Sequence, residues 1–468
     1  MTQARGQTAS DPGVRGDSLT GELAGIVGQP HVLTDPDVVA SYEVDWTNRW
    51  RGRARLVVRP GSTEEVASVL AACTRHAAPI VPQGGNTGLV GGGVPRAGEV
   101  VMSLGRLDGI GPVDVVAGQV RAGAGATLAR VQQRAQAAGC EFGVDLAARE
   151  SATVGGMVAT NAGGVHVVRY GAMRANVIGL EIVLADGKVI TRMDGLVKDN
   201  TGYDLVGLLV GSEGTLGIVT AAQLRLVPQC TERVVVVVPV PDLAQAVSIC
   251  GALRRRLPDL QALEAIDARG IELVTTFGEL PPLYRDRSLP PWTLLVECAS
   301  TRSVMDDVTA GLADLVDLDS ALVATEPGRR GELWSYRERL TASIARAGIA
   351  HKLDVTLPFP RLPSFEAELR SRLASAFPGV EPVLFGHLGD GNLHVNLLGV
   401  DPDDDEIDEA VLTLVAQNGG SISAEHGIGT VKRRFVALTR SAADIETMRT
   451  IKVALDPGNL LNPGVLLP

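Results

Sequence analysis

Short apolar runs alternate with amphipathic stretches along most of this chain. The runs at 56–60 (LVVRP) and 79–85 (PIVPQGG) are rich in aliphatic residues and end at Pro or Gly, which predicts strands. Residues 62–76 between them predict a helix, because Ser62 is a favourable N-cap and Glu65 completes a capping box. Further predicted strands are VVMSL (100–104), QVRAGAG (119–125), LEIVLAD (180–186), IVTAAQLRLV (218–227) and VVVVVPV (234–240). The pattern predicts a protein of both helices and strands, with a boundary between domains near residue 229.

Net charge, cysteine content and the lack of long apolar segments disfavour several classes of protein. The net charge is −11, which disfavours a nucleic-acid partner. Five Cys without a C-x-x-C pair are typical of a reducing compartment. The first residues lack the apolar segment of a secretory signal, and the longest aliphatic run, 234–238, is far shorter than the ~20 residues that span a bilayer. We therefore expect a cytoplasmic protein without a transmembrane segment.

Glycine is the strongest compositional signal, since 54 of the 468 residues are Gly. Many fall in three loops, at 82–95 (PQGGNTGLVGGGVP), 151–164 (SATVGGMVATNAGG) and 211–220 (GSEGTLGIVT). Such loops expose backbone N–H groups without side chains in the way, as a pyrophosphate requires. Three of them favour a large phosphate-bearing cofactor; the alternative is that the glycines only form turns. A fourth stretch, Gly123-x-Gly125, has Leu128 where the dinucleotide fingerprint needs Gly, which favours a simple turn before a helix.

A histidine pair flanks a turn signal, GDGN at 389–392. A symmetric hairpin about this turn would place His387 opposite His394, with Cβ atoms ~5 Å apart. Asn396 lies two residues beyond His394 and so on the same face of the strand. With Glu425, the two histidines form a His₂Glu set that leaves a coordination position open, as catalytic zinc sites do. The alternative is a pair of core histidines without a metal.

Three further residues can hold a carboxylate. Arg337 and Thr341 are spaced i, i+4, which places them on one face of a predicted helix, and Lys352 follows in a predicted strand. Arg offers a planar fork and Lys a point charge. Lysine is rare here, at five residues against 38 Arg, so its presence is informative. The alternative is an amphipathic helix with a solvated face.

Seven motifs in a fixed order resemble one protein family. They are PQGGNTGLVGGGVP, GVDLAARESATVGGMVATNAGG, RYGAMRANVIGLEIVLADG, GSEGTLGIVT, GHLGDGNLHVN, SAEHGIG and DPGNLLNPG. Together they resemble the FAD-dependent D-2-hydroxyacid dehydrogenases (D-2-hydroxyglutarate, D-lactate and glycolate dehydrogenases) of the vanillyl-alcohol-oxidase (PCMH) flavoprotein superfamily. The resemblance runs from about residue 35 to the C-terminus. It implies an α+β fold, in which a PCMH-type FAD-binding domain of two subdomains is followed by an α+β cap domain with an antiparallel sheet.

The resemblance also implies how the chain is divided. We expect a disordered lead over residues 1–18, the FAD-binding domain over 19–229, the cap with its metal site over 230–425, and a segment over 426–468 that returns to the flavin. Asn86 stands where relatives with covalent flavin have His, so we expect non-covalent FAD. The residues expected at the cofactor are Pro82, Gly84, Gly85, Asn86, Thr87, Gly88, Ser151, Gly155, Gly156, Thr160, Asn161, Gly163, Glu213, Ile218 and Asn462.

The family's reaction supplies the remaining roles. His387, His394 and Glu425 match metal ligands, usually for zinc, and His426 matches the general base. The residues that match substrate contacts are Arg337, Thr341, Lys352 and Asn396. The first three match the D-2-hydroxyglutarate branch, where they hold the distal carboxylate.

We expect oxidation of a D-2-hydroxy acid, with D-2-hydroxyglutarate favoured, to the 2-oxo acid by hydride transfer to flavin N5 with metal-assisted deprotonation of the hydroxyl. The alternatives are a D-lactate or glycolate dehydrogenase and, more remotely, a metal-dependent hydrolase. The sequence leaves the electron acceptor open among a quinone, an electron-transfer flavoprotein and a partner subunit. A homodimer is common for such chains.

Overall fold

The computed structural model describes residues 18–284, 288–402 and 404–468. The expected disordered lead lies outside the described residues except for Ser18, which begins the first helix. The helices are α1 Ser18–Val27, α2 Pro36–Val39, α3 Thr63–Arg75, α4 Leu128–Gln136, α5 Val154–Thr160, α6 Val167–Tyr170, α7 Met173–Asn176, α8 Leu205–Leu209, α9 Leu243–Arg256, α10 Ala268–Phe277, α11 Met305–Leu312, α12 Pro327–Glu338, α13 Leu340–Ala347, α14 Leu362–Ala376, α15 Asp405–Gln417 and α16 Ala442–Leu455.

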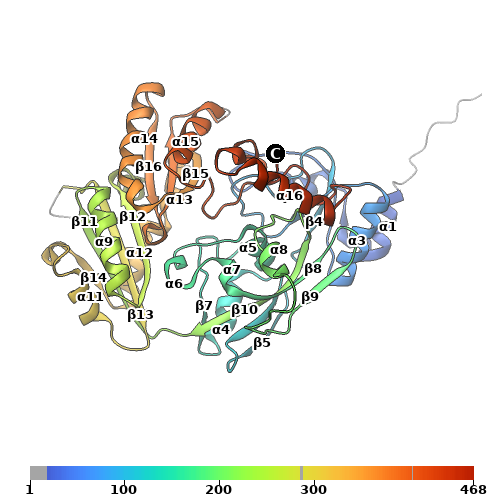
Figure 1. The fold of residues 1–468 in the computed structure, drawn as a ribbon, viewed down its shortest axis with the longest axis horizontal. Coiled ribbons are helices and arrows are strands. Elements are labelled where there is room, and N and C mark those ends of the chain that lie inside the picture. Colours follow the sequence, from blue (N-terminus) through green and yellow to red (C-terminus); the bar gives the residue numbers. More distant parts are fainter. Residues whose placement is uncertain (1–17, 285–287, 403) are drawn as a thin grey trace, which may run out of the picture.

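Three sheets complete the fold, and the predicted α+β class is confirmed. The strands are β1 Val32–Leu33, β2 Ala54–Val58, β3 Ile80–Gln83, β4 Glu99–Ser103, β5 Ile110–Asp114, β6 Gln119–Gly123, β7 Cys140–Phe142, β8 Val177–Val183, β9 Val189–Arg192, β10 Ile218–Pro228, β11 Glu232–Val240, β12 Leu260–Asp267, β13 Trp292–Ser300, β14 Leu322–Ala324, β15 His351–Thr356, β16 Glu381–Gly386 and β17 Asn392–Leu398. Elements before the β10–β11 link gather on one side of the molecule and those from β11 to α15 on the other, while α16 lies back on the first side (Figure 1).

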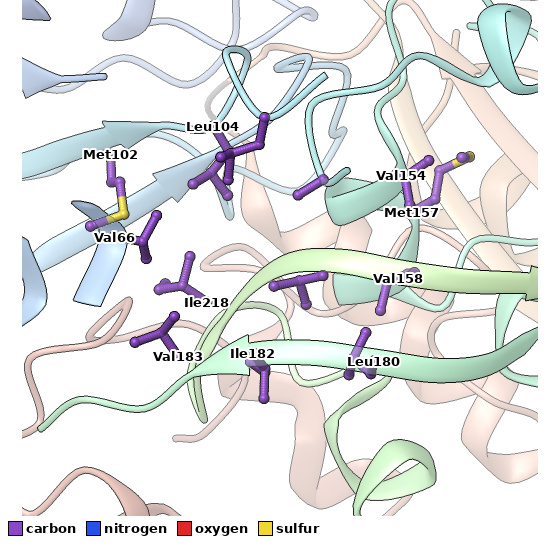
Figure 2. Close-up of a cluster of buried hydrophobic side chains, with 14 of the residues drawn as sticks. Val66, Met102, Leu104, Val154, Met157, Val158, Leu180, Ile182, Val183 and Ile218 are labelled. Atoms are coloured by element: carbon purple, nitrogen blue, oxygen red, sulfur yellow. The ribbon is translucent and has the colours of Figure 1, made fainter. Parts of the chain in front are cut away.

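The first unit contains two sheets. One has the order β1-β2-β4-β3, and the other has β5-β6-β10-β8-β9 with β7 paired to β10. The predicted helix after Gly61 is α3, and Ser62 accepts the N–H of Glu65 as expected. The Glu65 carboxylate accepts from Gly61 rather than from Ser62, so the capping box is shifted by one residue. Figure 2 shows buried side chains from both sheets and from α3 and α5 meeting in one core.

The second unit is a seven-stranded antiparallel sheet of order β14-β11-β13-β12-β16-β17-β15. Its own cores contain residues from Val234 to Phe435. Two of its strands supply three of the predicted site residues, because Lys352 lies in β15 and both His394 and Asn396 lie in β17. This unit therefore carries most of the chemistry-bearing side chains.

The predicted register of the histidine hairpin is wrong. A 3₁₀ turn, η5 (Leu388–Asp390), lies between β16 and β17, and Gly391 follows at φ 82°. The connection is therefore longer than a tight turn, and His394 pairs with Phe385 instead of His387. His387 lies just beyond the end of β16, where its ring still approaches that of His394, at 5.3 Å between centroids.

The C-terminal segment returns to the first unit, where α16 lies over the elements coloured blue and green in Figure 1. Ile80 in β3 donates its N–H to Leu460 and accepts that of Asn462, both at 2.8 Å. Leu461 is fully buried in the core of the first unit. The last residues of the chain are thus fixed beside the strand that leads into the loop at 82–95.

Two remaining expectations concern the cysteines and the membrane. All five cysteines are free, and four of them are buried, as small core residues would be. Within the described part of the chain, no helix combines the length and apolar character needed to cross a bilayer.

Candidate functional site

A cavity of about 540 Å³ lies where the two units meet, and it is lined by both. Such a volume is typical of a cofactor or substrate site. The predicted residues in its wall are Pro82, Gly84, Gly85, Thr87, Gly88, Ser151, Gly155, Gly156, Thr160, Gly163, Glu213, Ile218, Arg337, Thr341, Lys352, His387, His394, Asn396, Glu425, His426 and Asn462. Side chains and loops that are far apart in the sequence therefore meet around one space.

The glycine-rich loop at 82–95 presents unpaired backbone donors. None of the N–H groups of residues 85–93 donates to a residue that the structure describes. The loop also packs tightly on its neighbour, since a Cβ at Gly85 would stand 1.7 Å from the carbonyl oxygen of Ser151. The Oγ1 atom of Thr153, also in the cavity wall, is buried without a partner. These donors and the glycines of the wall fit the pyrophosphate of FAD.

Two of the predicted cofactor residues, Asn86 and Asn161, are not in the cavity wall. Both have left-handed backbone conformations, with φ of 53° and 52°, which Asn tolerates better than most residues. The Asn86 amide donates to the carbonyl of Val44, and the Asn161 carbonyl oxygen accepts from Arg174. Their side chains therefore stabilise the two loops by hydrogen bonds on the side that faces away from the cavity.

Glu213 and Asn462 join the loops to one another. The Glu213 carboxylate accepts the N–H groups of Ile428 and Gly429, at 2.8 and 2.7 Å. Burial raises the pKa of Glu213, and these two donors oppose the rise. The Asn462 amide donates to the carbonyls of Gly92 and Glu213. The segment after His426 is thereby held against the glycine-rich loops.

Three histidines converge on one carboxylate oxygen. The Nε2 atoms of His387, His394 and His426 lie 3.5, 3.6 and 3.7 Å from Oε1 of Glu425. A tetrahedral ion with bonds of ~2.0–2.1 Å has ligand atoms about 3.4 Å apart. The separations are thus those of ligands around a shared ion, and the donor set suits zinc. His387, His394 and Glu425 would hold the ion, with His426 beside it.

Each of these histidines turns its other ring nitrogen towards a buried carboxylate. Nδ1 of His387 lies 2.7 Å from Oε1 of Glu264, while Nδ1 of His394 and His426 lie 3.4 and 3.8 Å from the two oxygens of Asp354. Carboxylates in this position fix the tautomer of a metal-binding histidine, with the proton on Nδ1 and the lone pair on Nε2.

Asp354 itself is saturated as an acceptor. Its Oδ2 accepts three consecutive backbone N–H groups, those of residues 424–426, and its Oδ1 accepts from Asn392. Burial would raise the pKa of Asp354, but His426, His394 and Lys432 hold it well below its ordinary value. One Asp354 oxygen lies within 4.8 Å of ligand atoms of His394, Glu425 and His426, a group that could hold a cation, and the Asp354 carboxylate also faces both histidines from behind.

The charges of the cluster favour a cation at its centre. Burial lowers the pKa of His387, but Glu264 and Glu425 outweigh burial and raise it to about 10. Burial likewise raises the pKa of Glu425, while His387 and His394 lower it to about 2. The buried carboxylate of Glu264 and the partly buried one of Glu425 thus stabilise positive charge on the histidine rings, which either a proton or a metal ion can supply.

Arg337 and Thr341 reach the cavity from two helices instead of one. The predicted single helix is wrong, since α12 ends at Glu338 and α13 begins at Leu340. The Nε atom of Arg337 donates to Oε2 of Glu264, at 2.5 Å. Both residues nevertheless line the cavity.

Lys352 brings a cation into the wall of the cavity. Among the described residues, none forms a hydrogen bond or ion pair with its ammonium. Its Nζ instead lies over the ring of Trp46, 5.1 Å from the centroid. Burial lowers the pKa of Lys352, and Asp45 raises it in part. A half-buried ammonium without a carboxylate partner is suited to an anionic ligand.

Sequence reasoning missed three of the residues that shape this site. Glu264 and Asp354 each lie inside a strand, and Trp46 lies in an N-terminal loop, so none of the three belongs to a recognisable motif. For Glu264, the sequence did contain an indication. Every residue of β12, including Glu264, is buried, and an acidic residue in such an apolar strand calls for a buried partner.

Comparisons with known proteins cover almost the whole chain. Residues 54–192 match the family model "FAD binding domain", and residues 230–466 match "FAD linked oxidases, C-terminal domain". A mitochondrial D-2-hydroxyglutarate dehydrogenase of Bos taurus is 37% identical over 453 residues, with 93% of this chain and 81% of that protein covered. A D-2-hydroxyglutarate dehydrogenase of Xanthomonas citri pv. viticola is 36% identical, with 92% and 93% covered.

Solved structures share the fold at low identity. p-Cresol methylhydroxylase has a TM-score of 0.76 at 19% identity, with 95% of each chain covered. Alkyldihydroxyacetonephosphate synthase has a TM-score of 0.76 at 17% identity, with 97% of this chain and 86% of that chain covered. The arrangement of the two units is therefore shared with proteins whose sequences have diverged widely.

Proposed function

The chain belongs to the FAD-dependent D-2-hydroxyacid dehydrogenases of the FAD-linked oxidase family, and we propose that its substrate is D-2-hydroxyglutarate, which it oxidises to the 2-oxo acid. The expected family is confirmed, and an FAD-binding domain removes the metal-dependent hydrolase, which would leave the glycine-rich loops without a purpose. The choice of substrate and the metal are the proposal.

The observation that carries the choice of substrate is the unpaired ammonium of Lys352 in the wall of the cavity. A substrate with a second carboxylate gives this cation a partner, and Arg337 and Thr341 line the same cavity. D-lactate and glycolate have no distal carboxylate, so they would leave the half-buried ammonium of Lys352 without a partner. Leaving one member of such a pair unmatched is costly, which makes the site selective.

The chain's own residues provide position and proton transfer. FAD, when bound, accepts the hydride from C2 of the substrate. A divalent ion held by His387, His394 and Glu425, most suitably zinc, would make the substrate hydroxyl easier to deprotonate. His426 takes the hydroxyl proton at Nε2, and Asp354, 3.8 Å from its Nδ1, stabilises the imidazolium that results. Asn396 lies in β17 on the same face as His394 and contacts the substrate.

The mode of flavin attachment follows from Asn86. Covalent attachment in relatives uses a His at this position, and the Asn86 side chain is engaged with Val44. We therefore propose that FAD is bound without a covalent bond.

The electron acceptor is proposed to be a quinone, an electron-transfer flavoprotein or a partner subunit. Homodimer formation and a cytoplasmic location stay predictions.

Anaerobic reduction of the bound flavin tests the proposed substrate. The purified holoenzyme is mixed with D- and L-2-hydroxyglutarate, D-lactate and glycolate, and loss of visible flavin absorbance is followed. D-2-hydroxyglutarate is expected to bleach the flavin at the lowest concentration, and its L-enantiomer not at all. Faster bleaching by D-lactate or glycolate would replace the proposed substrate by that acid.

A further inference from the structure

Trp46 is placed at the cavity by a short hairpin near the N-terminus. Val44 and Arg51 form an isolated antiparallel bridge, and Asp45 donates its N–H to the carbonyl of Trp50 at 3.1 Å. The Asp45 carboxylate closes the turn, accepting the hydroxyl of Thr47 at 2.6 Å and the N–H of Trp50 at 3.1 Å. Asp45 is buried. The hairpin, residues 44–51, is thus internally braced, with Trp46 near its tip.

The hairpin bridges the two units. On one side, Asn86 in the cofactor loop donates to the carbonyl of Val44 at 2.8 Å. On the other, Nε of Arg49 donates to the carbonyl of Pro402 at 2.9 Å, and its guanidinium lies 3.7 Å from Asp408 of α15. These anchors hold Trp46 over Lys352 in the neighbouring strand β15. The indole is 49% exposed, so one part faces solvent while the other lines the cavity.

We propose that Trp46 covers the end of the cavity at Lys352 and is the residue that makes a second carboxylate on the substrate favourable. The proposal rests on the proposed function and names a further specificity determinant of the same site. The indole face lies 5.1 Å from Nζ, a distance at which it stabilises the ammonium in a partly dehydrated setting. A carboxylate that pairs with Lys352 under this cover is shielded from water, which strengthens the attraction. A monocarboxylate does not reach Lys352 and gains nothing.

Binding of unreactive acids to the oxidised holoenzyme isolates this effect from turnover. Glutarate and butyrate share a carbon skeleton of similar length but differ in the second carboxylate, and each is titrated while the flavin spectrum is recorded. Trp46→Ala is expected to raise the Kd of glutarate about 10-fold, the loss that one charge-assisted contact predicts, and to leave butyrate within about twofold. Trp46→Phe keeps an aromatic face and is expected to stay near wild type.

Two further variants make the comparison specific. Trp50→Phe alters the same hairpin outside the cavity wall and is expected to change neither Kd. In a Lys352→Met background, Trp46→Ala is expected to have little further effect, because the two residues act on one carboxylate. FAD content and melting temperature show that each variant is folded.

The outcomes separate the two proposals. An equal loss of glutarate and butyrate binding in Trp46→Ala, or an unchanged Kd for glutarate, overturns the role of Trp46 and leaves the proposed substrate standing. Wild-type protein that binds glutarate no more tightly than butyrate overturns both. A glutarate preference lost in Trp46→Ala, in an enzyme that D-lactate reduces fastest, supports Trp46 and overturns the proposed substrate.

Discussion

Oε1 of Glu264 lies 2.7 Å from Nδ1 of His387, and the carboxylate is fully buried in β12. Its second oxygen accepts from Nε of Arg337, so one carboxylate orients both a proposed metal ligand and a proposed substrate residue. Burial would raise the pKa of Glu264, but His387 and Arg337 lower it, which keeps the group ionised between them. The proposed metal site and the proposed carboxylate site are thereby linked through a single side chain.

Glu264→Gln tests this link. The amide keeps the shape but loses the charge and can accept at one atom only, so we expect metal affinity to fall about 10- to 100-fold. The KM for D-2-hydroxyglutarate should also rise, because Arg337 loses its anchor. Metal content of the purified protein and steady-state kinetics measure the two effects. Glu272→Gln, at an exposed position of α10, is the matched control, and a variant with full metal content and normal KM would contradict the role.

His426→Ala tests the proposed general base. Removal of a positioned base lowers kcat by about 10²- to 10⁴-fold, and we expect a loss in that range with FAD still bound. Flavin absorbance and anaerobic reduction rates are the measurements. His76→Ala, which removes a surface histidine that pairs with Glu22, should keep full activity. Turnover at the wild-type rate in His426→Ala would assign the proton transfer to another group.

Removal of the metal should stop turnover without releasing FAD. His387, His394 and Glu425 come from the second unit, whereas the unpaired N–H donors belong to residues 85–93 of the first unit. Dialysis against a chelator is therefore expected to abolish activity while the flavin spectrum persists, and added zinc should restore turnover. The metal proposal is refuted if chelated protein, shown to be metal-free, remains active.

The pH dependence should differ between substrates. Burial lowers the pKa of Lys352 below the ~10.4 of a free lysine, so its charge is present below this lowered pKa and lost above it. For D-2-hydroxyglutarate, kcat/KM should fall as pH rises through that value. D-lactate should show no such alkaline decline, and Lys352→Met should remove it for D-2-hydroxyglutarate. An identical alkaline decline for both acids would show that another group titrates.

Whether FAD is bound covalently can be tested directly. Acid precipitation should leave the flavin in the supernatant, because Asn86 offers no imidazole for covalent attachment. Absorbance of the supernatant and of the redissolved pellet gives the distribution. Flavin that stays with the pellet after washing would mean that another residue forms a covalent bond.

The sequence by itself determined the local features of this protein. Short apolar runs predicted a mixture of strands and helices, the capping signal at Ser62 predicted α3, and the glycine-rich loop at 82–95 predicted a phosphate-binding wall. His387, His394 and Glu425 were named from residue types and spacing, and they meet in one cavity. These features depend on short stretches of chain, where steric preferences and hydrogen bonding act between near neighbours.

Only the tertiary structure decided how the pieces face one another. The pairing of His394 with Phe385 depends on the extra 3₁₀ turn, which the periodicity of either strand does not report. Glu264 behind His387 and Trp46 over Lys352 join residues far apart in the chain. Such contacts arise from the packing of one sheet, one hairpin and two units against each other. The shape and charge of the site were therefore set by long-range burial, which local patterns do not encode.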